Sequence, residues 1–338
     1  RRQRQMCIRD RPKTLYPKKM LSRKNKLLVM KIISLFSVVR GYNIPVILLA
    51  QYLSAIFILS PEDVRALDVI LDINLFILVL VSSFCIASGY IINNFYDAQK
   101  DLINRPNKSM LDRLVSQKTK LYVYFGLNFL SVFLAYFVSW RVSLFYSVYI
   151  FLIWFYSHKL KKYPIIGNLT ASVLAVFPFF GILLYYFKGQ YLEYDWQKIG
   201  IIFGHASFLF LLILIREMVK DLENMKGDFV TDYKTVPVVY GERISKIAIT
   251  VLTTLTVIPI YLLVDIYEVG YMVIYFYVCM ILMIFLLIKL WKSNSREEFL
   301  KLHNLLKFII VAGVFCIVLI DPTVLWHGKK VLLALNGH

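Results

Sequence analysis

Asn93-Asn94-Phe95-Tyr96-Asp97-Ala98-Gln99-Lys100-Asp101 is the first of two acidic stretches that decide how this chain folds, and Asp221-Leu222-Glu223-Asn224-Met225-Lys226-Gly227-Asp228 is the second. Each stretch stands where a long apolar run ends and a basic segment begins. Residues four apart share one face of a helix, so Asn93, Asp97 and Asp101 present one oxygen-bearing side chain per turn. Carboxylate and carboxamide oxygens suit Mg²⁺, which is normally held by one or two carboxylates together with substrate phosphates. The pattern therefore predicts a magnesium site for a diphosphate, and the apolar surroundings predict that the rest of the substrate is a lipid.

Composition places the chain among membrane proteins. Hydrophobic residues make up 59% of its 338 residues, whereas about 45–50% is usual in soluble proteins. The formal net charge is +18, but the basic residues lie between the apolar runs and form no continuous stripe, so no nucleic-acid partner is expected. The cysteines, Cys7, Cys85, Cys279 and Cys316, are widely separated and predict neither a disulfide framework nor a zinc site.

The apolar runs predict an all-α polytopic fold, because helices satisfy their own backbone hydrogen bonds in lipid and these runs are too long for the strands of a barrel. Nine segments have membrane-spanning or near-spanning length: residues 32–59, 73–95, 119–139, 142–157, 165–187, 198–219, 245–265, 270–290 and 305–320. The first acidic stretch ends the second segment, and the second stretch ends the sixth. This spacing predicts two similar bundles around a central cavity.

The two ends of the chain are expected to lie outside this domain. Residues 1–19 are highly charged and lack apolar periodicity, which predicts a disordered or non-native extension, with Met20 or Met30 as the natural start. Residues 20–325 form the predicted nine-helix domain, and residues 326–338 form a short tail.

Charge asymmetry predicts the orientation of the protein in an inner or plasma membrane. Lysines and arginines gather after the second, fourth, sixth and eighth apolar segments, and few lie on the opposite side. The positive-inside rule therefore places the amino terminus and both acidic stretches in the cytoplasm. The odd number of spans places the carboxyl terminus outside.

The acidic stretches resemble the signatures of the UbiA superfamily of intramembrane prenyltransferases. These signatures are N-D-x-x-D-x-x-x-D after the second helix and D-x-x-D-x-x-x-D after the sixth, and they correspond here to residues 93–101 (the first motif) and 221–228 (the second motif). The sequence nearby agrees, with Ile103-Asn104-Arg105-Pro106-Asn107 after the first motif and Lys234-Thr235-Val236-Pro237 after the second. Two positions depart from the pattern, since Asn94 and Asn224 stand where the family usually has Asp.

The resemblance implies that a prenyl group passes from an allylic prenyl diphosphate to a lipophilic or aromatic acceptor, with two Mg²⁺ ions bridged by the diphosphate. The implied metal ligands are Asn93, Asp97, Asp101, Asp221, Asn224 and Asp228. The implied catalytic residues are Asp97, Asp101, Asp221 and Asp228, together with Tyr156, which would lie near the departing diphosphate. The implied diphosphate-binding residues are Arg40, Asn43, Arg105, Lys108 and Lys161.

Two other classes of membrane protein fit the sequence less well. A secondary transporter usually places its ionisable site near the bilayer midplane, whereas the acids here gather at helix ends on the basic side. A CDP-alcohol phosphotransferase would carry a D-G-x-x-A-R run, which this sequence lacks. The acceptor stays open between quinone precursors, prenylglyceryl phosphates and similar compounds.

Overall fold

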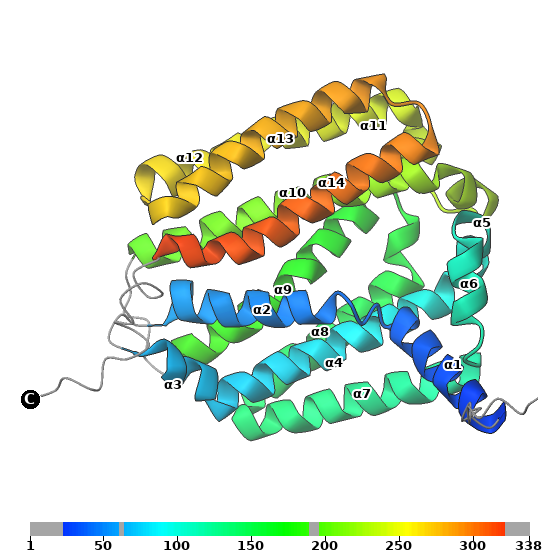
Figure 1. Ribbon diagram of the computed structural model, residues 1–338, viewed down its shortest axis with the longest axis horizontal. Helices are drawn as coiled ribbons and strands as arrows, with labels where there is room; N and C mark the ends of the chain where they lie inside the picture. Colours follow the sequence, from blue (N-terminus) through cyan, green and yellow to red (C-terminus); the bar gives the residue numbers. More distant parts are fainter. Residues whose placement is uncertain (1–22, 61–63, 189–195, 322–338) are drawn as a thin grey trace, which may run out of the picture.

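The long apolar runs form helices that extend side by side between two ends of the molecule (Figure 1). The computed structural model describes residues 23–60, 64–188 and 196–321. Every regular element within these ranges is helical. The α-helices are α1 Arg23–Val38, α2 Ile44–Ser54, α3 Ala66–Leu71, α4 Ile73–Tyr96, α5 Ala98–Asn104, α6 Pro106–Asp112, α7 Gln117–Val138, α8 Trp140–His158, α9 Ile166–Lys188, α10 Trp196–Val230, α11 Val236–Leu255, α12 Val257–Tyr261, α13 Val273–Lys292 and α14 Arg296–Cys316. The shorter π and 3-10 elements are η1 Ala55–Leu59, η2 Leu160–Lys162, η3 Leu262–Ile266, η4 Gly270–Met272 and η5 Ile317–Ile320.

Seven helical stretches in the described ranges are long and apolar enough to cross a membrane. They are Ile73–Tyr96, Gln117–Val138, Ile166–Tyr186, Ile199–Val230, Val236–Ile266, Gly270–Lys292 and Arg296–Ile320. The predicted segments 32–59 and 142–157 have no counterpart among them, and α8, which covers the second of these, is rich in tyrosine and tryptophan. The all-α membrane class is therefore confirmed, whereas the count of nine spans stays a prediction.

The first predicted segment, residues 32–59, is wrong as a single continuous helix. The chain leaves α1 after Val38, and Arg40 has the left-handed φ of 48°. A new helix, α2, then begins at Ile44 with Pro45 in its first turn. Proline lacks a backbone N–H and is tolerated in the first turn of a helix but not in its interior, so Pro45 starts a helix here. The break brings Arg40 close to the first motif.

Two helices are longer than their apolar runs. Helix α10 continues to Val230, so the second motif lies in its last turns and does not follow it. Helix α14 starts at Arg296, before the predicted residue 305, because a capping box begins it. There the Ser295 side chain accepts a hydrogen bond from the Glu298 amide, and the Glu298 side chain accepts one from the Ser295 amide. Hydropathy missed this start because the first turns of α14 are charged.

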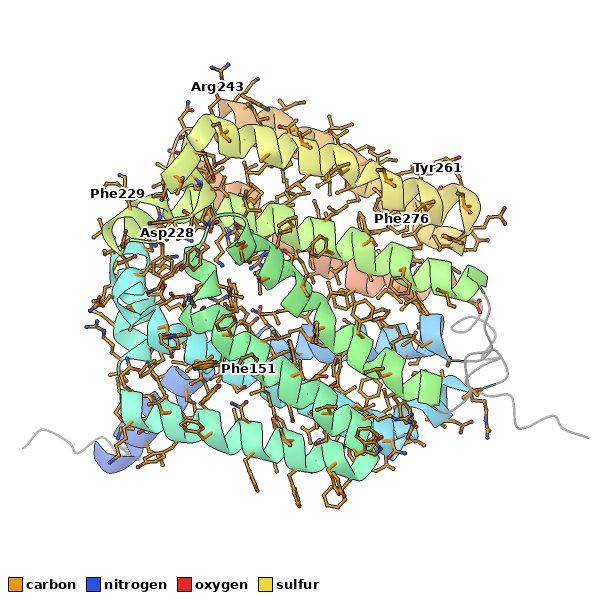
Figure 2. The ribbon with its side chains drawn as sticks, turned by 180° about the vertical axis from the view of Figure 1, so that it is seen from behind. Phe151, Asp228, Phe229, Arg243, Tyr261 and Phe276 are labelled. Carbon is orange, nitrogen blue, oxygen red and sulfur yellow. The ribbon has the colours of Figure 1, made fainter. Side chains whose placement is uncertain are left out.

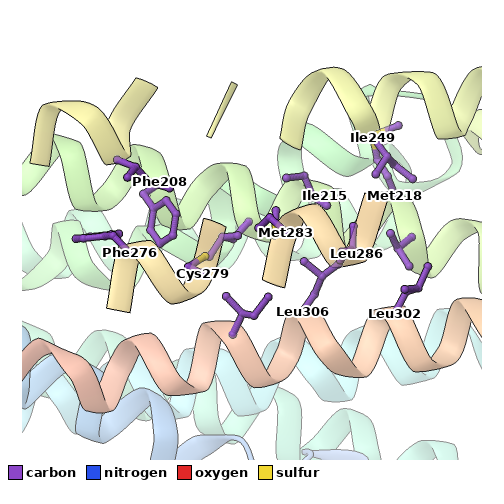
Figure 3. Packing of buried hydrophobic residues seen from close by; sticks show 14 of the residues in the cluster. Phe208, Ile215, Met218, Ile249, Phe276, Cys279, Met283, Leu286, Leu302 and Leu306 are labelled. Atoms are coloured by element: carbon purple, nitrogen blue, oxygen red, sulfur yellow. The ribbon is translucent and has the colours of Figure 1, made fainter. Parts of the chain in front are cut away.

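Buried apolar side chains form several clusters; two of them lie mainly in one half of the chain each, and a third joins η1, α3 and α4 to α9 and α10. The larger of the first two lies among α10, α11, α13 and α14, where Phe276, Leu286 and Leu306 are fully buried (Figure 3). The smaller lies among α4, α7, α8 and α9 and includes the fully buried Leu78 and Tyr146. This distribution agrees with the idea of two bundles, which stays a prediction. The ends predicted at residues 1–19 and 326–338 lie outside the described residues.

Charged side chains lie at both ends of the molecule, where the long helices begin and end. Figure 2 shows Asp228 and Phe229 at the end that also carries Arg243, with Tyr261 at the other end. At that other end Asp72 caps α4, accepting hydrogen bonds from the Asn74 amide at 2.9 Å and from the Tyr185 hydroxyl at 2.6 Å. Helix α4 therefore carries a capping carboxylate at one end and the first motif at the other.

Candidate active site

Both acidic motifs face one pocket at the basic end of the molecule. Its residues come from the turn between α1 and α2, from α4, α5, α8, η2 and α9, and from α10 with the segment that follows it. Nine residues of the predicted site line it: Arg40, Asn93, Asp97, Asp101, Arg105, Tyr156, Lys161, Asp221 and Asn224. The fold thus brings residues from both halves of the sequence into one polar site.

Asp97 lies at the break between α4 and α5, with φ −87° and ψ 4°. Its amide still bonds the Asn93 carbonyl at 2.9 Å, and its carbonyl accepts from the Asp101 amide at 2.8 Å, so the one-turn spacing of the stripe is kept. The Oδ1 atom of Asp97 accepts hydrogen bonds from Lys161 Nζ at 2.7 Å and from the Tyr233 hydroxyl at 2.8 Å. Lys161 Nζ also donates to Asn93 Oδ1 at 3.0 Å. One lysine therefore joins two residues of the stripe.

The two carboxylates of the first motif have different electrostatic surroundings. Burial would raise the pKa of Asp97, but the ammonium groups of Lys161 and Lys100 hold that pKa below its usual value. Burial, and then the neighbouring Asp97 carboxylate, raise the pKa of Asp101. Within the described part of the chain, no basic side chain forms an ion pair with Asp101. Asp101 is therefore the carboxylate of this motif that gains most from an added cation.

The second motif is carried by the last turns of α10. Asp221 Oδ2 accepts a hydrogen bond from Asn168 Nδ2 at 2.7 Å. Asp228 is fully buried beside the pocket, where its Oδ1 lies 2.6 Å from Nζ of Lys100 in the first motif. Asn224 donates from Nδ2 to the Lys220 carbonyl at 2.9 Å, while its buried Oδ1 has no hydrogen-bond partner among the residues that the structure describes. An unpartnered buried oxygen beside a polar pocket is a candidate ligand atom.

The two motifs also meet through residues beside them. Gly227 lies so close to Asn104 that a β-carbon at position 227 would collide with the Asn104 amide. Glu223 is buried, and its two oxygens lie 3.3 Å from Arg105 Nη2 and 2.7 Å from His303 Nδ1. Arg296, at the start of α14, donates to the Asn104 carbonyl. Helix α14 thus contacts both the segment after the first motif, through Arg296, and the second motif, through His303.

Three polar residues near the first motif face away from the pocket or lie outside its lining. Asn94 donates to Asp112 Oδ2 at 3.0 Å and accepts from Lys120 Nζ at 2.8 Å, so its amide is used in a buried network. Lys108 lies 3.5 Å from Asp112, and Asn43 donates to the Tyr90 hydroxyl at 3.3 Å. The Asn94 departure from the family pattern therefore removes no pocket carboxylate. The role expected of Asn43 and Lys108 in diphosphate binding stays a prediction.

The pocket also contains polar residues that the sequence did not single out: Lys100, Asn168, Glu217, Lys220 and Tyr233. Lys100 stands within the first motif, so its position next to two ligand candidates was a signal available from sequence. Burial lowers its pKa, but the Asp228 and Asp97 carboxylates outweigh this effect and raise that pKa above its usual value. Tyr233 and Asn168 gave no such signal, because their role depends on long-range contacts.

The oxygen donors fit a hard cation such as Mg²⁺. In the described part of the chain Asp101 forms no ion pair and Asn224 Oδ1 has no hydrogen-bond partner, and Asn93 and Asp221 add further oxygens to the same pocket. In the described ranges no three histidine, cysteine or acidic side chains are gathered as a ready metal cluster. Two of the carboxylates, Asp97 and Asp228, are instead paired with Lys161 and Lys100.

Comparison with known proteins gives consistent matches over most of the chain. Residues 48–309 match the model of the UbiA prenyltransferase family. The digeranylgeranylglyceryl phosphate synthase of Methanobrevibacter smithii is 30% identical over 264 residues, which are 73% of this chain and 89% of that protein. The synthase of Pyrococcus furiosus is 31% identical over 180 residues, 53% of this chain and 61% of that protein, so this match covers less than two thirds of that relative.

Solved structures share the fold. A structure from a study of digeranylgeranylglyceryl phosphate synthase in membranes superposes with a TM-score of 0.62 and 24% identity. The superposition covers 86% of this chain and 98% of the other. A UbiA homologue from Archaeoglobus fulgidus bound to GPP and Mg²⁺ superposes with a TM-score of 0.58 and 16% identity, covering 84% and 99%.

Proposed function

Because the chain belongs to the UbiA prenyltransferase family, we propose that it transfers a prenyl group from an allylic prenyl diphosphate to a prenylglyceryl phosphate in the membrane. The family match confirms the resemblance seen in the sequence and the predicted class of enzyme, a UbiA-like prenyltransferase in the membrane. The observation that carries the proposal is the convergence of both acidic motifs and Lys161 on one pocket. The acceptor is proposed because several relatives are named digeranylgeranylglyceryl phosphate synthase.

The proposed cofactor is a pair of Mg²⁺ ions bridged by the diphosphate. The Archaeoglobus homologue was solved with GPP and Mg²⁺ and with DMAPP and Mg²⁺, which supports a divalent cation and a prenyl diphosphate at this fold. In this chain Asn93, Asp97 and Asp101 would hold the metal on one side, and Asp221, Asn224 and Asp228 on the other. Bound Mg²⁺ would neutralise charge on the diphosphate and make it a better leaving group.

The chain's own residues supply the remaining chemistry. Lys161 and Lys100 neutralise buried carboxylates in the free site, and we propose that they turn toward the diphosphate when metal takes their place. Arg105 lines the same pocket and is held there by Glu223. Tyr156, at the pocket wall, would present its ring to the allylic cation that forms as the carbon–oxygen bond of the donor breaks. An acceptor hydroxyl then forms the new ether bond, and the released diphosphate accepts its proton.

The proposed topology keeps nine spans in two similar bundles around the pocket. The basic residues that gather at the motif end support a cytoplasmic position for that end. The amino terminus would then be cytoplasmic and the carboxyl terminus outside, in an inner or plasma membrane. Cysteine substitution at the described positions Lys159 and Asp68, labelled in intact cells with an impermeant thiol reagent, tests this. Labelling of Lys159→Cys from outside would contradict it.

The proposed reaction is tested with purified protein in nanodiscs. The protein is supplied with Mg²⁺, a series of prenyl diphosphates and either a prenylglyceryl phosphate or a hydroxybenzoate acceptor, and the products are identified by mass spectrometry. We expect a diprenylglyceryl phosphate and its loss on removal of Mg²⁺ with EDTA. Full turnover after exhaustive chelation would refute the metal role. Uptake of a solute by sealed vesicles without any prenyl transfer would support the transporter alternative.

A further inference from the structure

Lys307 is a charged residue inside a membrane-spanning helix that the proposed reaction has not used. It lies near the start of the apolar part of α14, about three turns after Arg296, the first residue of that helix. Charged side chains at membrane depth are rare and usually mark substrate or ion pathways. Lys307 is exposed, and within the described part of the chain it forms no ion pair. An ammonium here without an ion pair would be stabilised by an anion.

The neighbours of Lys307 follow from helix geometry. His303 lies one turn before Lys307 on the same face of α14 and contacts Glu223 of α10. Arg216 lies seven residues before Glu223, hence two turns away on the same face of α10. Helix α10 ends and α14 begins at the pocket end, and the two helices pack together in opposite directions. Arg216 and Lys307 therefore lie on the same side of the Glu223–His303 contact, deeper in the membrane.

The charges around Lys307 are predominantly positive. Its ammonium is within electrostatic range of Arg216, Arg105 and Arg40 and of the Glu223 carboxylate. Glu223 is already bound by Arg105 and His303, with contacts of 3.3 and 2.7 Å.

Glu217, the second carboxylate near Arg216, does not neutralise Lys307, and Arg40 adds a further positive charge. Glu217 is held by Arg216 at 2.7 Å and by Lys220 at 2.5 Å. The guanidinium of Arg40 lies over the Tyr90 ring, 5.0 Å from its centroid, and forms no ion pair with the described residues. Lys307 thus forms no ion pair with any described residue, and Arg40 has the Asp101 carboxylate within electrostatic range, without an ion pair to it.

We infer that Arg40, Arg216 and Lys307 bind the phosphate monoester of the lipid acceptor, with Arg40 facing the same pocket in which Lys100 and Lys161 serve the donor. The inference rests on the proposed function in taking the occupant to be an acceptor of prenyl transfer. A phosphate monoester carries about −1.5 to −2 charges near neutral pH and three strong acceptor oxygens. It would neutralise the free cations, and its lipid chain would lie along α14 in the membrane. Since Arg40 lines the pocket, the phosphate bound there would hold the acceptor hydroxyl toward the donor.

The inference is tested by direct binding in a neutral detergent without donor. The probes are a long-chain monoalkyl glyceryl phosphate and the corresponding monoalkyl glycerol, which lacks the phosphate. We expect the parent protein to prefer the phosphate probe, and Lys307→Gln to reduce that preference by on the order of 10-fold, the loss typical of a charged hydrogen bond. Lys307→Arg should retain the preference. Lys301→Gln is the matched control, because Lys301 is exposed on a different face of the same helix. Equal preference for the phosphate probe in parent and Lys307→Gln would overturn the inference.

Two further measurements are needed. One distinguishes a bound phospholipid from the acceptor, and the other distinguishes failure of the anion site from failure of the proposed function. Phosphorus analysis of the purified proteins tests a bilayer phospholipid as the occupant. If Lys307→Gln loses bound phospholipid but keeps its preference for the phosphate probe, the acceptor site is refuted. In turnover, Lys307→Gln should raise the KM for the phosphorylated acceptor and leave the KM for the donor unchanged. A parent protein that binds the phosphate probe selectively but transfers no prenyl group would refute the proposed function and leave the anion site standing.

Discussion

The first motif spans a break between two helices, whereas the second lies on one continuous helix. Asp97 stands at a helix break and depends on Lys161 and Tyr233 for its position. Asp221 and Asp228 lie on the uninterrupted helix α10, which packs along α9, α11 and α14. The first motif can therefore change side-chain partners without unwinding a helix. The second offers a fixed wall against which a metal and a diphosphate can be positioned.

The largest expected effect comes from removing one carboxylate of either motif. Asp97→Asn and Asp221→Asn should each lower kcat/KM by on the order of 10²-fold or more, the loss seen when a comparable electrostatic contact is removed. Because the metal ligands act as a unit, we expect similar losses from the adjustable and the fixed motif. Initial rates against Mg²⁺ concentration in nanodiscs measure this.

The matched control is Asp68→Asn, since Asp68 pairs with the exposed Arg65 at the other end of the molecule. It should change neither rate nor Mg²⁺ dependence. If Asp97→Asn and Asp221→Asn fold normally and turn over like the parent protein, the prenyltransferase mechanism proposed here is wrong.

The next largest effect concerns Lys161, which contacts the first motif from the segment before α9. Lys161→Ala removes a buried ammonium that contacts Asn93 and Asp97, so donor affinity should fall by about 10-fold or more. Lys159→Ala, two residues earlier on an exposed position, should leave it unchanged. Equilibrium binding of a non-hydrolysable prenyl diphosphate in the presence of Mg²⁺ distinguishes them. Equal donor affinity in both variants would show that Lys161 serves only the structure or the membrane topology.

A smaller effect tests the contact between the motifs. Gly227→Ala would place a β-carbon against the Asn104 amide, and overpacking of this kind typically costs about 1–3 kcal/mol of stability. Thermal unfolding should show a lower melting temperature for Gly227→Ala. Adding Asn104→Ala should restore part of it, because the colliding amide is then gone. An unchanged melting temperature in the single variant would mean that the Asn104 side chain can move away from the new methyl group without loss of stability.

Sequence patterns predicted the helices and the ligand stripe, because both depend on local spacing. The one-turn stripe of Asn93, Asp97 and Asp101 is kept in the backbone hydrogen bonds. Hydropathy failed where polar residues interrupt or begin a helix: at Arg40 and Pro45, which divide residues 32–59, and at the charged first turns of α14.

The partners of the motif residues could not be predicted. The contact between Tyr233 and Asp97 joins residues 136 apart in the sequence, and no local pattern encodes it. The position of Lys100 in the first motif was visible in the sequence, but its ion pair with Asp228 is a long-range contact that local spacing does not encode. For the same reason the sequence did not show that Asn94 belongs to a buried network with Asp112 and Lys120.

The smallest expected effect distinguishes the two asparagines that depart from the family pattern. The buried Oδ1 of Asn224 has no partner among the described residues, so Asn224→Asp adds a carboxylate to the second motif where a cation would bind. This variant should keep its activity or gain Mg²⁺ affinity by a few-fold, since hard cations favour carboxylate over amide oxygen. Asn94→Asp, by contrast, places its charge beside Asp112 and Lys120, away from the pocket, and should leave the Mg²⁺ requirement unchanged. Mg²⁺ titrations of initial rate for the two variants decide the matter. A tighter Mg²⁺ requirement in Asn94→Asp but not in Asn224→Asp would reverse the roles given to these residues.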